Sequence, residues 1–541
     1  MTMHLLPDLL RESALKHPDR KAIVYKDRSL SYADLENRSS RFGAALSGEG
    51  ISKGDRVGIM LHKSIESIIA LFGIMKAGAI YVPLDPGAPA VRVNAMLSHC
   101  GIECLVTSPE IGSTVWRDQQ TPVPLKKLIL TGGAPGDNAS HRGVRSLSWE
   151  AMESAASGNG TPVEMADTAP AYILHTSGST GVPKGVVISH LNAMTFVNMA
   201  TDVFSLNEND RIANHAPLHF DLSVFDIFGA IRSGAALVII PETLSPFAAK
   251  LAEYIDKEGI TIWNSVSSVL ALLADRGRLD RFSFDALRLA HFSGDVMPVK
   301  YLRVLMQHMK RARFYNIYGQ TEANSSLFYP VPDIPGNEAG KIPIGKPFPN
   351  FDVFALNDAQ EPISRPGEEG ELYVNASTVA VGYWNNEEMT REKFVPDPRH
   401  PAWSSRVYRT GDAVRIDAEG NYLFIGRKDH MIKSRGHRIE LAEIEGALNS
   451  HADVSCAVVL AVPDALAGNR IVAYVSPAEG TKPSPEEIAD HCRLTLPGYM
   501  VPEEIFVVGR MPRTTTGKAD RKQMQEAYLN RAVGQDILKN F

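Results

Sequence analysis

A short stretch of the chain concentrates the chemical groups that bind phosphate. Residues 175–185 read His-Thr-Ser-Gly-Ser-Thr-Gly-Val-Pro-Lys-Gly, so five of the eleven are Ser, Thr or Lys and three are Gly. Glycines let the backbone approach a ligand closely, and hydroxyl groups, free backbone N–H groups and a lysine donate hydrogen bonds to oxyanions. The spacing of the Walker loop is absent. We therefore predict a phosphate-binding loop of another type, with a Gly/Ser-rich surface turn as the alternative.

Alternating strand and helix patterns surround this loop and are typical of an α/β fold. Residues 171–174 predict a buried strand before the loop, and a helical pattern begins after Ser189. Further strands are predicted at 22–25, 56–61, 237–240, 260–263, 288–292 and 313–317, and helices at 63–76, 222–232, 247–258 and 298–310. This alternation favours parallel βαβ units, and open sheets of that kind bind ligands where their strands end. Residues 143–170 lack periodicity, and we expect a loop there.

The chain changes character beyond residue 340. Gly and Pro become frequent and the predicted strands shorten, as at 370–374 and 422–425, which suggests a β-rich subdomain. A compact α+β unit is then predicted from helices at 440–449 and 485–494 and strands at 454–462, 470–475 and 504–508. We place the domain boundary at Asp429. It separates an N-terminal domain of residues 1–428 from a C-terminal domain of residues 429–541.

The composition is that of a soluble globular protein. Apolar residues make up 44% and charged residues 22%, and the net charge of −6 offers no basic surface for nucleic acid. Four cysteines do not make a disulfide framework, and the cluster of His99, Cys100 and Cys104 lacks the second pair of a structural zinc site, so we interpret these cysteines as core or loop residues. The longest apolar run, 68–75, is too short to span a membrane, and the N-terminus does not resemble a signal peptide. We expect a cytoplasmic protein that binds neither membranes nor nucleic acid.

Five ordered motifs resemble those of the acyl-adenylate-forming superfamily, which includes acyl-CoA synthetases, luciferases and the adenylation domains of nonribosomal peptide synthetases. The motifs are Thr-Ser-Gly-Ser-Thr-Gly-Val-Pro-Lys-Gly at 176–185, Asn-Ile-Tyr-Gly-Gln-Thr-Glu at 316–322, Tyr-Arg-Thr-Gly-Asp at 408–412, Gly-Arg-Lys-Asp-His-Met-Ile-Lys-Ser-Arg-Gly-His-Arg-Ile-Glu at 426–440 and Pro-Arg-Thr-Thr-Thr-Gly-Lys at 512–518. The stretches 30–35 and 76–86 resemble early motifs of the amino-acid-adenylating branch. Two positions depart from the pattern. Gln320 replaces the usual Pro, so we expect a less rigid turn, and His175 stands where the family often has an aromatic residue.

The resemblance implies attack of a carboxylate on the α-phosphorus of ATP, with Mg²⁺ as the metal. Two anions must meet, so the protein has to position them and to stabilise their charge. The implied catalytic residues are Lys518, which bridges the carboxylate and the α-phosphate, Glu322, which binds Mg²⁺, and Thr321. Asp412 is implied to bind the ribose hydroxyls. The implied nucleotide-binding residues are Thr176, Ser177, Gly178, Ser179, Thr180, Gly181, Lys184, Gly294, Asn316, Tyr318, Thr321, Asp412 and Arg427.

Asp221 indicates the class of acid. In members that activate α-amino acids, an Asp at this position pairs with the substrate ammonium, and aryl-acid members usually lack it. The alternative is a helix N-cap, because a helix is predicted from residue 222. The positions that match the substrate pocket are Asp221, Leu222, Phe225, Asn264, His291, Ser293, Ile317, Ser325 and Ser326. Several of these residues form hydrogen bonds, which are costly to leave unpaired, so we expect a small or polar amino acid, with proline still among the candidates.

The implied architecture is a large N-terminal domain of layered α/β subdomains with a β-rich subdomain, and a small mobile α+β C-terminal domain that turns about Asp429. Only 23 residues follow Lys518, and no carrier-protein or condensation motif is present. We therefore expect a free-standing enzyme that transfers its amino acid to the phosphopantetheine thiol of a separate carrier protein. The alternatives are an acyl- or aryl-CoA ligase, against which Asp221 argues, and a nucleotide-binding regulatory protein with an inactive site, against which Lys518 and Glu322 argue.

Overall fold

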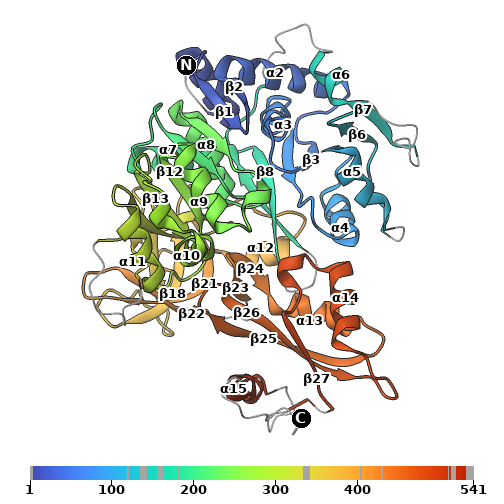
Figure 1. Cartoon of the computed structure of the whole chain (residues 1–541), viewed down its shortest axis with the longest axis vertical. Coiled ribbons are helices and arrows are strands. Elements are labelled where there is room, and N and C mark those ends of the chain that lie inside the picture. Colours follow the sequence, from blue (N-terminus) through green and yellow to red (C-terminus); the bar gives the residue numbers. More distant parts are fainter. Residues whose placement is uncertain are drawn as a thin grey trace.

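The computed structural model describes residues 4–118, 121–133, 143–154, 163–178, 183–332, 342–402, 405–427, 431–509, 511–512 and 520–531. Two large mixed sheets and a smaller antiparallel one make up the N-terminal part, and a hairpin and a small sheet follow in the C-terminal part. Figure 1 shows the C-terminal part below the large sheets, with the hairpin next to them. The predicted class is confirmed: a large α/β N-terminal domain followed by a small α+β C-terminal domain.

One large sheet carries the predicted phosphate loop. Its eight described strands lie in the spatial order β19 (Gly382–Tyr383), β9 (Lys184–Ser189), β8 (Pro170–Thr176), β4 (Ile80–Pro83), β3 (Arg56–Met60), β5 (Cys104–Thr107), β6 (Lys127–Leu130) and β7 (Arg145–Ser148). Neighbours from β8 through to β7 are parallel, whereas β8 and β9 are antiparallel. Thr176 pairs with Lys184 at the end of this antiparallel pair. The loop between them therefore leaves the sheet at one end.

The other large sheet supplies the predicted pocket residues. Its nine described strands lie in the order β16 (Lys346–Pro347), β15 (Asn324–Pro330), β14 (Arg313–Gln320), β13 (Leu289–Ser293), β12 (Ile262–Val266), β10 (Arg211–Asn214), β11 (Ala236–Ile239), β1 (Lys21–Tyr25) and β2 (Arg28–Ser31). Strands β12, β13 and β14 are parallel neighbours, with Asn264 beside His291 and His291 beside Tyr315. Their carboxyl ends meet at one edge, which is where an open sheet binds ligands.

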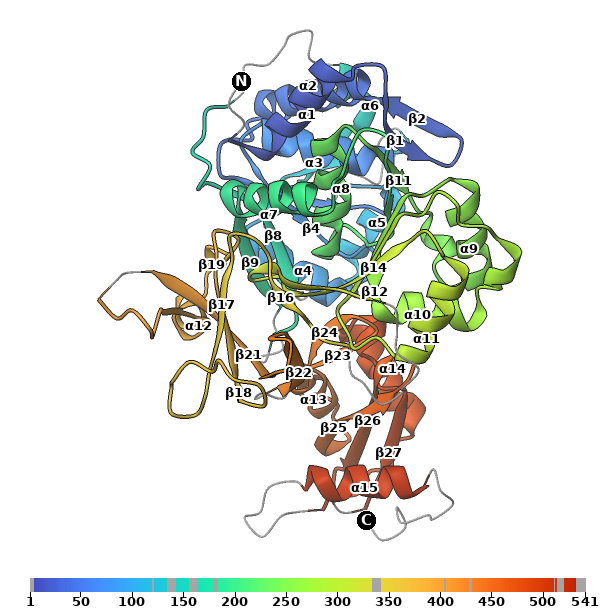
Figure 2. The same cartoon turned by 90° about the vertical axis from the view of Figure 1, so that its left-hand side faces the viewer.

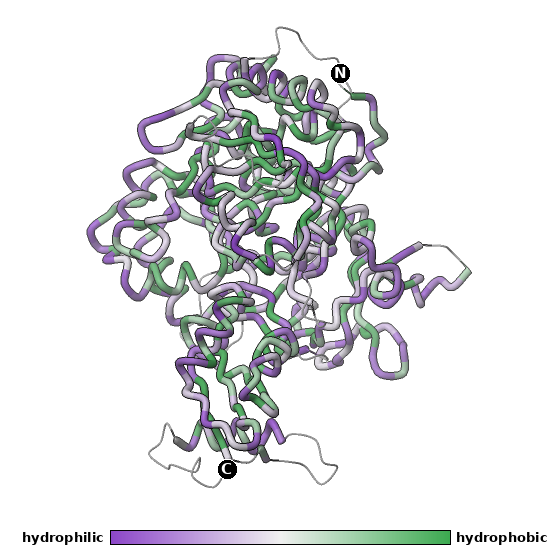
Figure 3. Tube along the Cα trace, turned by 90° about the vertical axis from the view of Figure 1, so that its right-hand side faces the viewer, coloured by the Kyte–Doolittle hydropathy of each residue, from purple (hydrophilic) through white to green (hydrophobic). Residues whose placement is uncertain are grey.

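Helices cover both sheets and bury their apolar faces. The largest core receives side chains from helices α1 (Leu6–Lys16), α2 (Tyr32–Gly48), α3 (Ile65–Lys76), α6 (Trp149–Ser154), α7 (His190–Val203) and α8 (Leu222–Ser233). Helices α9 (Ala248–Lys257), α10 (Ser267–Arg276) and α11 (Val299–His308) cover the nine-stranded sheet, and α4 (Ala90–Cys100) and the short α5 (Pro109–Gly112) pack on the eight-stranded one. Figure 2 shows the same helices from the side, and Figure 3 shows that hydrophobic stretches concentrate in the interior.

The remaining elements form the β-rich subdomain and the C-terminal unit. The β-rich subdomain contains β17 (Asp352–Leu356), β18 (Glu369–Asn375), β20 (Phe394–Pro396), β21 (Arg406–Ile416), β22 (Tyr422–Arg427) and α12 (Glu387–Lys393). The C-terminal unit contains the hairpin β23 (Met431–Ser434) and β24 (His437–Glu440), strands β25 (Val454–Asp464), β26 (Gly468–Pro477) and β27 (Glu504–Val507), and helices α13 (Leu441–Asn449), α14 (Pro485–Thr495) and α15 (Arg521–Arg531). Residues of α13 and α14 share a core with β25 and β26.

Most predicted elements are confirmed, and the exceptions have local reasons. The predicted loop at 143–170 is wrong in part, because it contains β7 and α6; β7 is a four-residue edge strand with half-exposed side chains, which leaves little hydrophobic alternation. The strand predicted at 260–263 begins two residues later, at Ile262. Several elements were not predicted, among them helices α1, α2, α4 and α10 and the β23–β24 hairpin. Helix α7 begins where expected, because Ser189 caps it by accepting a hydrogen bond of 3.1 Å from the Asn192 N–H.

Candidate active site

A cavity of about 120 Å³ lies where the carboxyl ends of β12, β13 and β14 meet the end of β8 and the β23–β24 hairpin. All but one of the predicted pocket residues line it: Asp221, Leu222, Phe225, Asn264, His291, Ser293, Ile317 and Ser325. Ser326 is buried and does not line it. Four predicted nucleotide-binding residues also line it, namely Thr176, Ser177, Gly294 and Thr321. The structure therefore brings the predicted substrate site and the start of the phosphate loop to one place.

Asp221 lies just before helix α8 but does not act as its cap. The residue already has helical dihedral angles, and its side chain accepts no capping hydrogen bond. Instead, Thr321 Oγ1 donates to Asp221 Oδ2 over 2.7 Å. Burial raises the pKa of Asp221, with the Thr321 hydroxyl opposing the shift. The N-cap alternative is therefore wrong, and Asp221 presents a buried carboxylate to the cavity, where a cationic ligand group would be stabilised.

The pocket wall is more aromatic than the sequence predicted. Phe196, Phe204 and Phe348 line the cavity beside Phe225, and no motif marked these three residues. The ring of His291 packs on Phe204 with centroids 4.1 Å apart. Burial lowers the pKa of His291 to about 3, so the ring is neutral near pH 7, and its buried Nε2 has no hydrogen-bond partner among the described residues. The wall therefore combines apolar rings with a neutral polar group.

Asn264 is fixed from behind by a buried carboxylate. Its Nδ2 donates to Asp226 Oδ1 over 3.0 Å and to the Leu222 carbonyl over 3.4 Å. Asn214 Nδ2 donates to the other oxygen of Asp226 over 3.2 Å. Because both amide hydrogens of Asn264 are used in this way, only its carbonyl oxygen remains to accept a hydrogen bond from a ligand.

The described part of the phosphate loop contacts the C-terminal unit. The Gly178 N–H donates to Glu443 Oε2 over 3.1 Å, and Lys184 Nζ donates to Glu440 Oε1 over 3.2 Å. Ser177 Oγ donates to the Arg438 carbonyl over 2.7 Å. Two carboxylates of the C-terminal unit therefore accept hydrogen bonds from the Gly178 N–H and from Lys184, the groups that are predicted to bind phosphate oxygens.

Asp412 is the centre of a buried hydrogen-bond group. Arg427 donates to its Oδ1, and Tyr318 and Gln320 donate to its Oδ2. Gln320 Nε2 also lies 2.6 Å from the Tyr318 hydroxyl, and Gln320 Oε1 is buried without a partner among the described residues. The residue that replaces the usual proline thus holds Asp412 in place. Asn316, another predicted nucleotide-binding residue, does not bond to Asp412; its amide donates to the Pro343 carbonyl over 2.7 Å.

Comparison with known protein families identifies the family of this chain. Residues 10–384 match the family described as AMP-binding enzyme, and residues 443–518 match the AMP-binding enzyme C-terminal domain. The chain is an AMP-binding enzyme. The first match contains Asp221, the phosphate loop and most of the cavity lining, whereas the hairpin that closes the cavity lies between the two matched ranges.

Several relatives of this AMP-binding enzyme are named as carrier-protein ligases or as peptide synthases. An L-proline–[L-prolyl-carrier protein] ligase from Pseudomonas fluorescens is 34% identical over 96% of this chain and 98% of its own length. Bacitracin synthase 1 from Bacillus licheniformis is 34% identical over 96% of this chain, which spans only 9% of that larger protein. NpsA-ThdA, an artificially fused adenylation–PCP di-domain from Klebsiella oxytoca, matches with a TM-score of 0.78 at 25% identity, over 93% of this chain and 94% of the other.

The metal that the family implies has one predicted ligand in this AMP-binding enzyme. Glu322 is fully buried, Arg438 donates to both of its carboxylate oxygens and Tyr383 donates to Oε1 over 2.7 Å. Burial by itself would raise the pKa of Glu322, but Arg438 and then Tyr383 hold it below its usual range, so the side chain is ionised. An ionised carboxylate suits Mg²⁺. Glu322 therefore fits the metal, provided that Arg438 moves away.

The β23–β24 hairpin of the AMP-binding enzyme forms one wall of the cavity. Lys433, Gly436, His437 and Arg438 line it. Gly436 has φ of 78° and its N–H donates to Asp295 Oδ2 over 3.0 Å; a Cβ there would lie 2.2 Å from Val266 Cγ1, so only glycine allows this approach. The charge-rich motif at 426–440 was the only sequence signal for this segment, and it did not predict the contact.

Several predicted residues of the AMP-binding enzyme lie outside the described residues: Ser179, Thr180, Gly181, Asp429 and Lys518. Their roles, and the domain boundary at Asp429, stay predictions. Four other predicted nucleotide-binding residues do not line the cavity: Tyr318, Asp412 and Arg427, which are joined by hydrogen bonds, and Asn316. In the part of the chain that the structure describes, no helix has the length and apolar character that crossing a membrane requires.

Proposed function

We propose that this enzyme activates a small or polar α-amino acid with ATP and Mg²⁺, releasing pyrophosphate, and transfers the amino acid to the phosphopantetheine thiol of a separate carrier protein. The observation that carries the proposal is the buried carboxylate of Asp221, which lines the cavity and takes its hydrogen bond from the neutral Thr321 hydroxyl. A substrate ammonium would give this carboxylate a charged partner in a site with little water. Acids without an amino group would leave the Asp221 carboxylate without a charged partner.

The cavity supports a small substrate. Its volume of about 120 Å³ is far below the several hundred Å³ typical of pockets for drug-sized ligands. Phe204 and Phe225 offer apolar contact, while the Asn264 carbonyl oxygen and His291 Nε2 leave hydrogen-bonding capacity in the wall. A short side chain with a donor group would use both. Proline, the substrate in the name of the Pseudomonas fluorescens relative, would use only the apolar part.

The residue roles of the proposal follow the motifs. The loop 176–185 binds the phosphates, Asp412 binds the ribose hydroxyls, and Glu322 holds Mg²⁺, which supplies positive charge to the phosphate oxygens. Lys518 bridges the substrate carboxylate and the α-phosphate, and the C-terminal domain turns about Asp429 between the two half-reactions. The docked hairpin, which places Arg438 on Glu322, supports the view that this arrangement follows pyrophosphate release.

A transfer to a carrier protein is favoured over transfer to coenzyme A for two reasons. Asp221 marks the amino-acid branch, and the relatives that match this chain end to end are named as ligases of prolyl-carrier proteins. Those names describe enzymes that join an amino acid to a carrier protein. The second substrate of this chain is therefore proposed to be a phosphopantetheinylated carrier protein that is supplied in trans.

A substrate panel tests the proposal. ATP–pyrophosphate exchange is measured with the common amino acids, with their deaminated analogues and with aryl acids. We expect exchange with one or a few small or polar amino acids and none with the deaminated or aryl acids. Thioester formation is then measured on a phosphopantetheinylated carrier protein and on free coenzyme A. Exchange driven by an aryl acid, or efficient thioester formation on coenzyme A, would replace the proposal with an acyl- or aryl-CoA ligase.

A further inference from the structure

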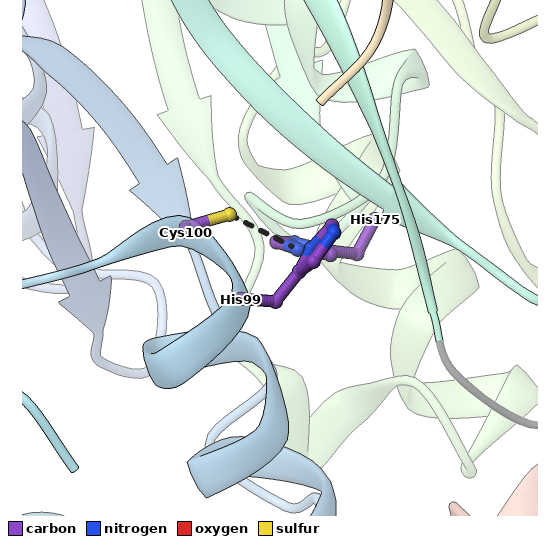
Figure 4. A group of neighbouring side chains, drawn as sticks. All are labelled: His99, Cys100 and His175. Carbon is purple, nitrogen blue, oxygen red and sulfur yellow. Dashed lines mark hydrogen bonds between the residues drawn. The ribbon is translucent and has the colours of Figure 1, made fainter. Parts of the chain in front are cut away.

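Three metal-binding side chains meet beside the active-site cavity, which His175 also lines. His99 and Cys100 end helix α4, and His175 lies on β8 directly before the phosphate loop. One ligand atom from each of these three residues lies within 4.8 Å of the other two, and Cys100 Sγ is 3.5 Å from His175 Nε2. Figure 4 shows the two imidazole rings and the thiol turned toward one another from these two elements. The proposed reaction uses none of the three side chains.

We propose that His99, Cys100 and His175 form a binding site for a thiophilic divalent cation, with Zn²⁺ as the best match. A tetrahedral zinc ion with bonds of about 2.0–2.1 Å to nitrogen and 2.3 Å to sulfur places a sulfur and a nitrogen ligand about 3.5 Å apart. The Cys100–His175 distance already equals that separation. His99 therefore needs a movement of only about 1 Å to complete three ligands.

The surroundings fit a site with three protein ligands and one open position. Cys100 is buried, whereas His99 and His175 are partly exposed, so a water molecule or another small ligand can take the fourth position. The His99 Nδ1 atom is buried without a hydrogen-bond partner among the described residues. On binding, the Cys100 thiol gives up its proton to solvent and the sulfur becomes the anionic ligand. Imidazole and thiolate select Zn²⁺ over the hard, oxygen-preferring Mg²⁺ that ATP brings.

The proposed metal site is directly connected to the phosphate loop through the backbone of β8. His175 pairs with Gly185 and is followed by Thr176, so it fixes the backbone where the loop leaves β8. A metal that holds His175 against helix α4 therefore restrains the first loop residues. We expect stoichiometric Zn²⁺ to slow ATP–pyrophosphate exchange, a consequence that rests on the proposed function, whereas metal binding itself does not.

Cobalt titration of the full-length chain tests the site without any activity. The protein is freed of metal with a chelator and titrated with Co²⁺, whose thiolate complexes have a strong near-ultraviolet charge-transfer band and whose tetrahedral complexes absorb in the visible range. We expect one Co²⁺ per chain, displaced by Zn²⁺. Cys100→Ser should lose the charge-transfer band, and His99→Gln and His175→Phe should each weaken Co²⁺ binding at least about tenfold.

Cys104→Ser is the matched control, because Cys104 is buried on β5 four residues away and is not part of the cluster. It should keep the band and the affinity. Circular dichroism confirms that each variant is folded, and Cys100→Ala provides a second variant if Cys100→Ser is not. The absence of a stoichiometric charge-transfer band in the wild-type chain, or a band that both histidine variants keep at full affinity, would overturn the site. Zinc inhibition that persists in Cys100→Ser would overturn the link to the loop.

Discussion

Arg438 NH1 donates to both carboxylate oxygens of Glu322, at 2.7 and 2.8 Å, in a pair that is almost completely buried. Glu322 is also the predicted Mg²⁺ ligand, so a guanidinium and a metal ion compete for one carboxylate. Similarly, Glu440 accepts a hydrogen bond from Lys184, and Glu443 accepts one from the Gly178 N–H. Both donors are predicted to bind phosphate oxygens. The docked C-terminal unit therefore places a cation and two anions where Mg²⁺ and pyrophosphate are expected.

Removing the Arg438 guanidinium, which competes with Mg²⁺ for Glu322, should change the rates of the two half-reactions differently. In Arg438→Gln, Mg²⁺ no longer displaces a guanidinium, so we expect pyrophosphate exchange to saturate at lower Mg²⁺ with an undiminished maximum rate. Transfer to the carrier should fall at least about tenfold, because docking would leave the buried Glu322 charge without its partner. Arg435→Gln, on the same hairpin turn but exposed and paired with Glu503, is the control. An equal loss in both half-reactions would contradict the competition.

The approach of Gly436 to Val266 predicts a steric block of docking. In Gly436→Ala the new Cβ would meet Val266 Cγ1 at 2.2 Å, and φ of 78° disfavours any side chain. We expect carrier transfer to fall at least about tenfold while pyrophosphate exchange changes less than about twofold. Gly446→Ala is the control, because a Cβ there meets no atom within 4 Å. Adding Val266→Gly, which removes both Cγ atoms and the Cβ that would lie 2.5 Å away, should restore part of the transfer rate; no restoration would argue against this contact as the cause.

Gln320 should matter for ATP and not for the amino acid. Its Nε2 donates to Asp412 and lies 2.6 Å from the Tyr318 hydroxyl, so it orients the predicted ribose carboxylate. A hydrogen bond to a charged group contributes about 1.5–3 kcal/mol. We expect Gln320→Leu to raise the KM for ATP roughly tenfold or more and to leave the amino-acid KM unchanged. Gln320→Pro restores the usual family residue and tests whether a rigid turn can replace the side chain. An unchanged ATP KM in both variants would leave Gln320 without a positioning role.

Asp221→Asn tests the ammonium partner directly. An ion pair at ~4 Å with an effective dielectric constant of about 20 contributes about 4 kcal/mol before desolvation. We expect kcat/KM for the amino acid to fall roughly 10²-fold or more, since about 1.4 kcal/mol is tenfold. The asparagine oxygen can still accept the Thr321 hydrogen bond, so the fold and the ATP KM should be unaffected. Full activity of this variant would show that the substrate is not recognised by its amino group.

The sequence predicted the parts of the site that depend on local spacing. Thr321 and Glu322 follow β14 in one motif, and Asp221 precedes α8, so their positions follow from the chain path. Phe204 and Phe348 were missed because they reach the cavity from segments that carry no chemistry-bearing pattern.

Contacts between the two domains could not be predicted at all. Arg438 lies in a recognised motif, but its partner Glu322 is 116 residues away, and the pairing depends on how one folded unit docks on another. Cys100 was interpreted as a core or loop residue because the sequence showed no second pair of ligands near it, and His175, which meets it in the structure, lies 75 residues away. Local patterns encode elements and their caps, whereas these clusters exist only after the sheets have packed.

Asp226 should make the stability of the enzyme depend on pH. Burial raises the pKa of this carboxyl from 3.8 to about 7, although the amides of Asn264 and Asn214 donate to it. Between these two values the folded state binds a proton that the unfolded state has lost, so the contribution of Asp226 to the free energy of unfolding falls as pH rises. The contribution is complete below about pH 4 and lost above about pH 7, and a shift of this size amounts to at most about 4 kcal/mol.

Buried histidines change stability in the opposite direction, so a comparison of variants isolates Asp226. Burial lowers the pKa of His215 to about 3, and such a group adds stability as pH rises toward its unfolded value. Urea unfolding is therefore measured for the wild type and Asp226→Asn between about pH 5 and pH 8. We expect the difference in unfolding free energy to move in favour of the variant by a few kcal/mol over this range, because asparagine has no proton to lose. The exposed Asp285→Asn is the control and should run parallel to the wild type. A pH-independent difference for Asp226→Asn would mean that Asp226 keeps one charge state throughout, with Asn264 bound to it equally well at every pH.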